Sequence, residues 1–139
     1  MTLRVALVVP DGEIWSGNAR MVITKTLDGD LGVLSAHPSV LGILAEGSVV
    51  RILDAEDSSS GAQAGPEVRA AVSSGFLAVN DDRVSILARQ AELGSRVDRA
   101  AVRAELDAAL DEASGTPGEA ESPGIKYSRA RLRAAGDGS

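Results

Sequence analysis

The sequence predicts an α+β protein, with a β-sandwich domain over residues 1–90 and a C-terminal helical domain over residues 91–139. Over the first 88 residues, short apolar runs alternate with Gly, Asp, Asn and Pro at the spacing typical of an all-β sandwich. After Ala88 the apolar residues recur at a helical period, and residues 96–113 contain neither Gly nor Pro. A chain of 139 residues holds one domain with a small appendage.

Eight or nine candidate strands follow one another in the first part of the chain. Two turn signals separate them clearly: Asp28-Gly29 tolerates the positive φ of a hairpin, and Asn80-Asp81-Asp82 turns the chain into a last strand that ends at Ala88. Residues 54–67 are acidic and rich in Ser and Gly, so we expect an exposed hairpin tip there. The candidate strands are residues 3–9, 14–15, 18–26, 31–34, 40–41, 48–53, 68–72, 76–79 and 83–88.

Two helices are expected after the strands. Ser95 followed by Asp98 fits an N-terminal cap, and the helix then runs over residues 96–113 with a weakly apolar face that contains Val102 and Leu106. Residues 114–124 have the composition of a linker. A second, short helix is expected over residues 125–135, before Gly136 ends it.

The composition argues against catalysis and metal binding. Apolar residues make up 44% of the chain but only three are aromatic, so the core must be mainly aliphatic. The chain has no Cys and a single His, which excludes disulfides, thiolate chemistry and multi-His metal sites. No phosphate-binding loop, nucleophile elbow or His-Glu-x-x-His motif is present. We therefore expect no catalytic residue and no metal ligand, a turn-forming role for Asp81-Asp82, and a surface or interface position for His37.

The charges are divided unevenly along the chain. The total is 14 basic against 20 acidic residues, a net charge of −6, which argues against binding to nucleic acid or anionic lipid. No apolar run approaches the roughly 20 residues needed to cross a bilayer, so we expect a soluble protein without membrane insertion. The expected second helix is basic throughout and holds no acid; its cations are Lys126, Arg129, Arg131 and Arg133. Either an acidic partner orders this helix, or it is a solvated tail or folds back on the acidic sandwich.

The order of elements resembles the epsilon subunit of bacterial F-type ATP synthases, in its actinobacterial form. Three stretches carry the resemblance. They are Val9-Pro10-Asp11-Gly12 with Ile14-Trp15-Ser16-Gly17; residues 26–34 (TLDGDLGVL) continuing through His37-Pro38 to Leu41; and residues 72–79 (VSSGFLAV) with 84–88 and Ala91-Glu92. They follow one another along the whole chain in the family's order and spacing. Two departures affect the His loop, because Ser35 replaces the family's Pro and Pro38 directly follows His37.

The resemblance implies a flattened β-sandwich or barrel of about ten strands followed by a helical hairpin. It implies a non-catalytic central-stalk subunit that couples the gamma subunit to the membrane rotor ring, peripheral at the cytoplasmic face of the cell membrane. Asp30 and His37 occupy the positions of the ring-facing contact. The basic helix with Lys126, Arg129, Arg131 and Arg133 is the implied inhibitory element, which swings towards acidic segments of the catalytic head.

The same resemblance implies ATP as a regulatory ligand, while no cofactor is required. Its contacts fall near Asp98, Arg99 and Arg103, although Ala101 and Val102 stand where the family's motif has Arg-Ala. Two alternatives to the stalk subunit remain from the residues alone. One is a free-standing β-sandwich binding module with a basic tail that recruits an acidic partner, and the other is a small enzyme.

Overall fold

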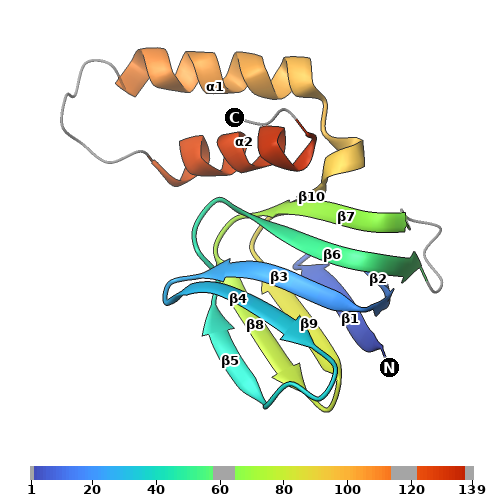
Figure 1. Ribbon diagram of the computed structural model, residues 1–139. Helices are drawn as coiled ribbons and strands as arrows, with labels where there is room; N and C mark the ends of the chain where they lie inside the picture. The colour runs from blue at the N-terminus through green and yellow to red at the C-terminus, as the bar shows by residue number, and fades with distance from the viewer. Residues whose placement is uncertain (1, 58–64, 114–121, 137–139) are drawn as a thin grey trace.

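The computed structural model describes residues 2–57, 65–113 and 122–136. Within these ranges the chain forms strands, then one short 3-10 helix and two α-helices (Figure 1). The strands are β1 (Leu3–Val9), β2 (Gly12–Ala19), β3 (Met21–Thr26), β4 (Gly29–Leu34), β5 (Val40–Ile43), β6 (Ser48–Asp57), β7 (Gly65–Val72), β8 (Gly75–Asn80), β9 (Arg83–Ala88) and β10 (Ala91–Leu93). The helices are the 3-10 helix Gly94–Arg96, α1 (Arg99–Ala113) and α2 (Pro123–Ala134).

The ten strands form two sheets that face each other, which confirms the expected sandwich. The first sheet has the order β6-β2-β1-β9-β8-β5, and the second has the order β4-β3-β6-β7-β10. Strand β6 belongs to both: its first part pairs with β3 and β7, and Glu56 and Asp57 pair with β2. A long strand that changes sheets closes one corner of the sandwich. All pairs are antiparallel except β1 with β9.

The core between the sheets is aliphatic, as the composition predicts. Alternate residues of each strand point inward, for example Leu3, Val5 and Leu7 of β1, all with no exposed surface. Trp15 is the one aromatic member among the described residues of this cluster. The sheets are therefore held together mainly by the burial of Val, Leu and Ile side chains.

Three sequence-based expectations about the strands are wrong. The candidate strand at residues 18–26 is two strands, because Arg20 turns the chain from one sheet into the other and its N–H donates to the carbonyl of Leu53. Residues 54–67 are not all loop, since β6 and β7 extend into this segment, whose positions 58–64 lie outside the described residues. Strand β9 is not the last strand, because β10 pairs with β7. The domain division at residues 90 and 91 stays a prediction.

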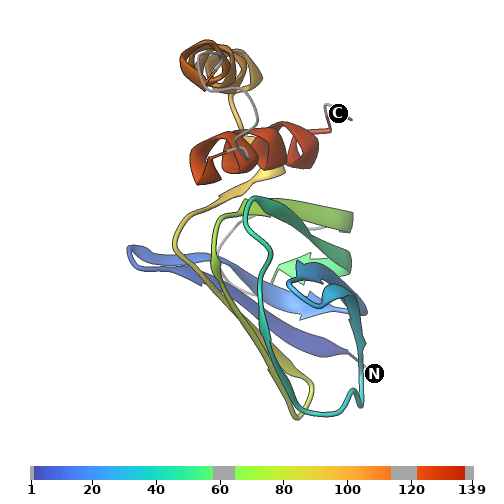
Figure 2. The same ribbon diagram turned by 90° about the vertical axis from the view of Figure 1, so that its left-hand side faces the viewer.

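The two α-helices stack in layers on the second sheet. Helix α2 lies between α1 and strands β6 and β7, and α1 lies on α2 (Figure 1, Figure 2). Val102 and Leu106 of α1 meet Ile125 and Leu132 of α2 in a small apolar cluster. Ala130 and Ala134 of α2 meet Ala71 of β7 in another. The expected helical hairpin is confirmed, but α2 begins at Pro123, inside the linker expected over residues 114–124. Residues 114–121 of that linker lie outside the described residues.

Asp98 caps α1, and the expected cap at Ser95 is wrong. The Asp98 carboxylate accepts a hydrogen bond of 3.1 Å from the N–H of Ala101, and its carbonyl accepts one from Val102. Ser95 belongs to the preceding 3-10 helix. At α2 the Ser122 hydroxyl accepts from the N–H of Ile125, with Pro123 at the first helical position.

Two glycines let α2 approach the sandwich closely. A Cβ on Gly47 would lie 2.4 Å from the Lys126 backbone, and a Cβ on Gly94 would lie 2.0 Å from the carbonyl oxygen of Ala134. One glycine thus meets the start of α2 and the other meets its end. Any other residue at these two positions would hold the helix away from the sheet.

Candidate functional site

The two expected ring-facing residues lie at opposite ends of the edge strand β4. Asp30 is exposed at the start of β4, opposite Lys25 of β3. His37 follows the end of β4, beside the β8–β9 turn, in a hollow that Asp81 and Asp82 also line. Asp30 and Leu34 are four positions apart along the strand, a distance of about 13 Å. The structure therefore does not gather Asp30 and His37 into one cluster.

The outer face of the first sheet carries a row of four apolar side chains, three of them exposed and one half-buried. Ile43, Phe76, Leu87 and Val8 are successive partners in the registers of β5, β8, β9 and β1, and we call them the outer apolar row. Ile43, Phe76 and Leu87 each leave 51–52% of their surface exposed. Contiguous apolar surface of this kind is typical of a contact surface.

Arg131 joins α2 to two other elements through their carboxylates. Its Nε donates to Glu92 of β10 at 2.7 Å, and its Nη1 donates to Glu105 of α1 at 3.1 Å. Its guanidinium also lies 5.6 Å from the ring centre of Tyr127. Partial burial opposes the charge, but the hydrogen bond and charge of Glu92 and the charge of Glu105 raise the pKa of Arg131. Arg131 therefore holds α2 in its docked position.

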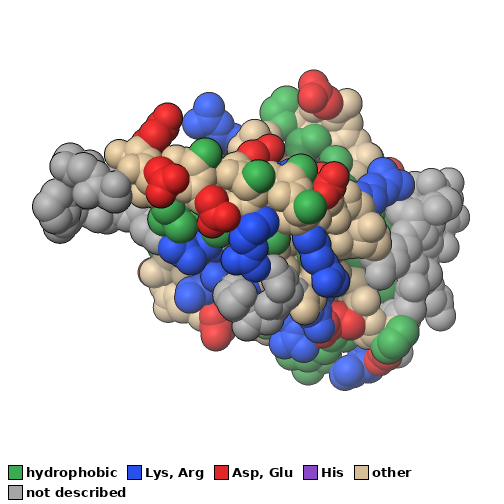
Figure 3. Space-filling model, turned by 90° about the horizontal axis from the view of Figure 1, so that it is seen from above, with side chains coloured by type: hydrophobic (Ala, Val, Ile, Leu, Met, Phe, Trp, Pro, Cys, Tyr) green, Lys and Arg blue, Asp and Glu red, His purple; other side chains and the backbone are tan. Residues whose placement is uncertain are grey.

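The other cations of α2 lie in different surroundings from Arg131. Lys126 and Arg133 line a groove with Lys25 and Arg51 of the sandwich, and Arg133 donates to the carbonyl of Gly47 at 3.1 Å. Arg129 is half-buried. Seen from above, Lys and Arg side chains gather beside the acidic side chains of α1 (Figure 3). The basic helix folds back on the protein, which is one of the three outcomes left open by the sequence.

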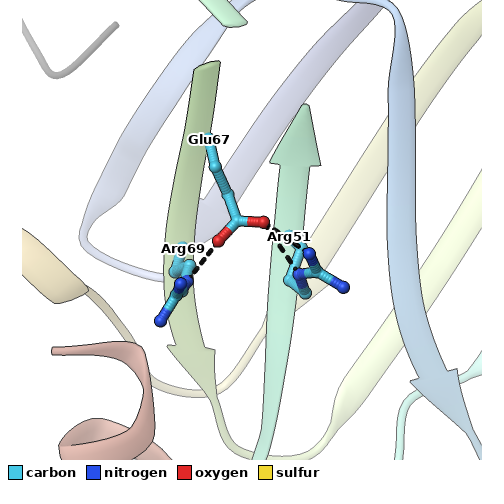
Figure 4. Close-up of polar contacts among 3 residues, drawn as sticks. All are labelled: Arg51, Glu67 and Arg69. Carbon is cyan, nitrogen blue, oxygen red and sulfur yellow. Dashed lines mark hydrogen bonds and ion pairs between the residues drawn. The ribbon is translucent and has the colours of Figure 1, made fainter. Parts of the chain in front are cut away.

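Glu67 lies between two arginines on the outer face of the second sheet (Figure 4). Its Oε1 accepts from Arg51 at 2.6 Å, and its Oε2 accepts from Arg69. Arg51 and Arg69 are directly opposite each other in the β6–β7 register. The hydrogen bond from Arg69, supported by Arg51 against some desolvation, lowers the pKa of Glu67.

The residues suggested for ATP are bonded within the protein. Asp98 caps α1, and the Arg99 guanidinium donates to the carbonyl of Ala135 at the end of α2. Arg103 is exposed one helical turn further on. ATP would have to compete with the bond between Arg99 and Ala135.

The described residues hold neither a cluster of metal ligands nor a helix able to cross a membrane. Over residues 2–57, 65–113 and 122–136, His, Asp and Glu side chains nowhere gather in a group of three that could hold a metal ion. Among the described helices, none combines the length and the apolar content that crossing a membrane requires.

Sequence reasoning missed the surfaces that depend on strand register. The outer apolar row comes from four strands, and its members lie in four separate segments of the sequence. The carboxylates that meet Arg131 come from elements 39 and 26 residues away. The alternation of apolar residues in β8 and β9 was a usable signal, since it puts Phe76 and Leu87 on the face away from the core.

These features define a β-sandwich protein with a docked helical pair and exposed contact surfaces. Residues 2–94 match the family described as ATP synthase, Delta/Epsilon chain, beta-sandwich domain. The ATP synthase epsilon chain of Thermobifida fusca is 47% identical over 135 residues, which cover 96% of this chain and 91% of that relative. The epsilon chain of Mycobacterium avium is 36% identical over 137 residues, 96% of this chain and 95% of the relative. The chain belongs to the ATP synthase epsilon chain family, which confirms the resemblance.

Two solved structures share the fold. A chain of the Euglena gracilis mitochondrial ATP synthase superposes with a TM-score of 0.64 at 19% identity, over 98% of this chain and 80% of that chain. A chain of the Tetrahymena thermophila mitochondrial ATP synthase central stalk and c-ring gives a TM-score of 0.53 at 17% identity, over 97% and 91%. At these identities the comparison supports the fold of both parts, sandwich and helices.

Proposed function

We propose that the chain is a non-catalytic rotor subunit in the central stalk of a proton-translocating F-type ATP synthase. It packs one face of the sandwich on the gamma subunit and contacts the membrane ring through Asp30 and His37, on the cytoplasmic face of the cell membrane. The outer apolar row is the observation that carries this proposal. Membership of the epsilon chain family supports it over a free-standing binding module.

The outer apolar row suits a partner that stays bound. Phe76 and its neighbours lie on the sheet opposite to the one that α2 covers, so the row remains open while α2 is docked. Burial of apolar surface contributes about 25 cal/mol per Å². The row therefore supplies affinity for the gamma subunit, whereas the exposed Asp30 supplies mainly orientation.

The proposal is tested by association with the two partners. The full-length chain is incubated at micromolar concentration with the gamma subunit, and separately with the purified membrane ring, and each mixture is captured and washed. We expect the chain to be retained by both. Retention by neither would reject the stalk assignment.

We further propose that α2 is a regulatory element with a docked and a released state. In the docked state Arg131 is bonded to Glu92 and Glu105, while Lys126 and Arg133 lie over the sandwich. Release would present Lys126, Arg129, Arg131 and Arg133 to acidic segments of the catalytic head. A docked helix and a released one interconvert usefully only if their free energies differ by a few kcal/mol.

The regulatory proposal predicts a change in ATP hydrolysis by the assembled enzyme. Deletion of residues 114–139 removes α2, and we expect hydrolysis to increase. Unchanged hydrolysis would exclude the inhibitory role while leaving the stalk role intact.

ATP binding at Asp98, Arg99 and Arg103 is a separate proposal. Titration calorimetry of the full chain with ATP tests it directly. Binding only at millimolar concentrations counts as absence of a regulatory site.

A further inference from the structure

The loop that carries His37 is bonded to a turn from a distant part of the chain. Asp82 Oδ1 accepts a hydrogen bond of 2.6 Å from the N–H of Ala36, and Asp82 Oδ2 accepts one of 2.9 Å from the Ser35 hydroxyl. Ser39 Oγ donates to Asn80 Oδ1 at 3.0 Å. Three hydrogen bonds thus join the β4–β5 loop to the β8–β9 turn, across 41 to 47 residues of sequence.

The Asp82 carboxylate supports a backbone conformation that alanine rarely adopts. Ala36 has a φ of 68°, in the left-handed region, where a Cβ is disfavoured. The hydrogen bond to its N–H offsets part of that cost. The bond from Ala36 and then the bond from Ser35 lower the pKa of Asp82, so the ionised carboxylate is the form that holds the loop.

The same loop orients the imidazole of His37. Its Nδ1 lies 2.7 Å from the carbonyl oxygen of Pro38, and since a carbonyl only accepts, Nδ1 carries the proton. In the neutral ring Nε2 is then an acceptor. The loop therefore offers a hydrogen-bond acceptor to a partner group that donates.

We propose that Asp82 is a positioning residue, whose carboxylate holds the His37 loop in the geometry that meets a donor-bearing polar loop of the membrane ring. This inference rests on the proposed ring contact. Without the carboxylate the loop samples other conformations. The affinity for the ring then falls in proportion to the fraction of molecules that keep the conformation able to bind.

The neighbouring aspartate provides a matched control. Asp81 and Asp82 both have positive φ, 50° and 61°, which Asn tolerates, and Asp81 has no hydrogen bond to the His37 loop in the described chain. Asp82→Asn and Asp81→Asn remove the same charge one residue apart. They therefore share any effect of net charge on the encounter with the ring.

The test measures the affinity of full-length variants for the purified ring at 25 °C, together with their thermal midpoints. We expect Asp82→Asn to weaken binding about tenfold, the scale of one charge-assisted hydrogen bond, and Asp81→Asn to change it less than twofold. Ser35→Ala should weaken binding about threefold in the wild-type background and have no effect in the Asp82→Asn background. If Asp82 had only a structural role, Asp82→Asn would lower the thermal midpoint. The effects of Ser35→Ala and Asp82→Asn on ring affinity would then be additive.

Failure of the Asp82 role and failure of the ring contact give different results. Equal affinities of Asp82→Asn and Asp81→Asn overturn the positioning role alone, as do additive effects of Ser35→Ala and Asp82→Asn. A wild-type chain that does not bind the ring overturns the proposed ring contact and, with it, the role of Asp82.

Discussion

Glu67 shows how a single residue makes a pair of like charges tolerable. Arg51 and Arg69 face each other across β6 and β7, and like charges in directly opposite positions destabilise a sheet. Glu67 accepts hydrogen bonds from both and leaves 20% of its side chain exposed. The two arginines expose 47% and 44%, so solvent weakens the interaction.

We expect Glu67→Gln to lower the free energy of unfolding by about 0.5–1 kcal/mol, since it removes the charge that separates the arginines. Thermal unfolding should show a fall of about 1–4 °C in the midpoint. Glu13→Gln is the control, because Glu13 is exposed on β2, where it lies opposite Val8 of β1. Equal midpoints for the two variants would contradict the role assigned to Glu67.

The stabilisation by Glu67 depends on pH with a definite sign. Its pKa is lowered from 4.5 in the folded state, so the unfolded chain takes up the proton first as the pH falls. The contribution is complete above pH 4.5 and is lost as the pH falls through the folded-state pKa. The difference in unfolding free energy between wild type and Glu67→Gln should therefore shrink below pH 4.5, which urea titrations at several pH values measure.

At the scale of elements, the docking of α2 depends on glycines outside the helix. A Cβ on Gly94 would lie 2.0 Å from the Ala134 carbonyl oxygen, whereas a Cβ on Gly124 would meet only the Ser122 hydroxyl at 4.0 Å. Gly94 has no positive φ, so alanine is compatible with its own backbone. The effect of replacing Gly94 by alanine therefore depends on the close contact with Ala134.

We expect Gly94→Ala to weaken docking of α2 by about 1–3 kcal/mol, the usual cost of overpacking. A 12-residue helix is marginal in water once released, so its amides should exchange with solvent about fivefold faster or more. Hydrogen exchange read by mass spectrometry checks this segment against the sandwich, which should not change. Gly124→Ala should leave exchange in α2 equal or slower, and faster exchange in that control would refute the argument.

Local signals predicted those elements whose pattern is complete within a few residues. The alternation of β1 and the hairpins at Asp28-Gly29 and Asp81-Asp82 were predictable, because side-chain period and turn chemistry are local. The first of these turns is formed by Leu27 and Asp28, and Gly29 already belongs to β4. Strand β10 was not, since three residues show no alternation and only pairing with β7 defines them. Ser95 and Asp98 are equally good caps by residue type. The 3-10 helix at Gly94–Arg96 decided between them.

The surfaces could be predicted less well than the strands. Asp30 and His37 were assigned by resemblance, and their separation along β4 follows only from the fold. The outer apolar row requires the register of four strands, which no short window contains. Docking of α2 requires glycines that are 40 or more residues away from the positions they meet.

At the scale of the whole molecule, one outer face of the sandwich is covered by α2 and the other is exposed. Helix α2 covers Val49 and Ala71 on the second sheet, while the outer apolar row on the first sheet stays exposed. Release or docking of α2 therefore changes one face and leaves the other as it is. In the proposed stalk role, the chain would keep its gamma contact at this row while α2 is released or docked.

The outer apolar row predicts which substitution separates gamma binding from folding. Phe76→Asp places a charge in the centre of the row. The side chain is 52% exposed and lies outside the core, so the sandwich should still fold. The affinity for the gamma subunit should fall at least tenfold. Leu34→Asp is the matched control, because Leu34 is 47% exposed but lies on β4 of the other sheet, and its gamma affinity should be unchanged. Affinities from calorimetry with the gamma subunit, and thermal midpoints for folding, decide between the outcomes. Equal losses of gamma affinity in both variants would mean that the gamma subunit does not sit on this row.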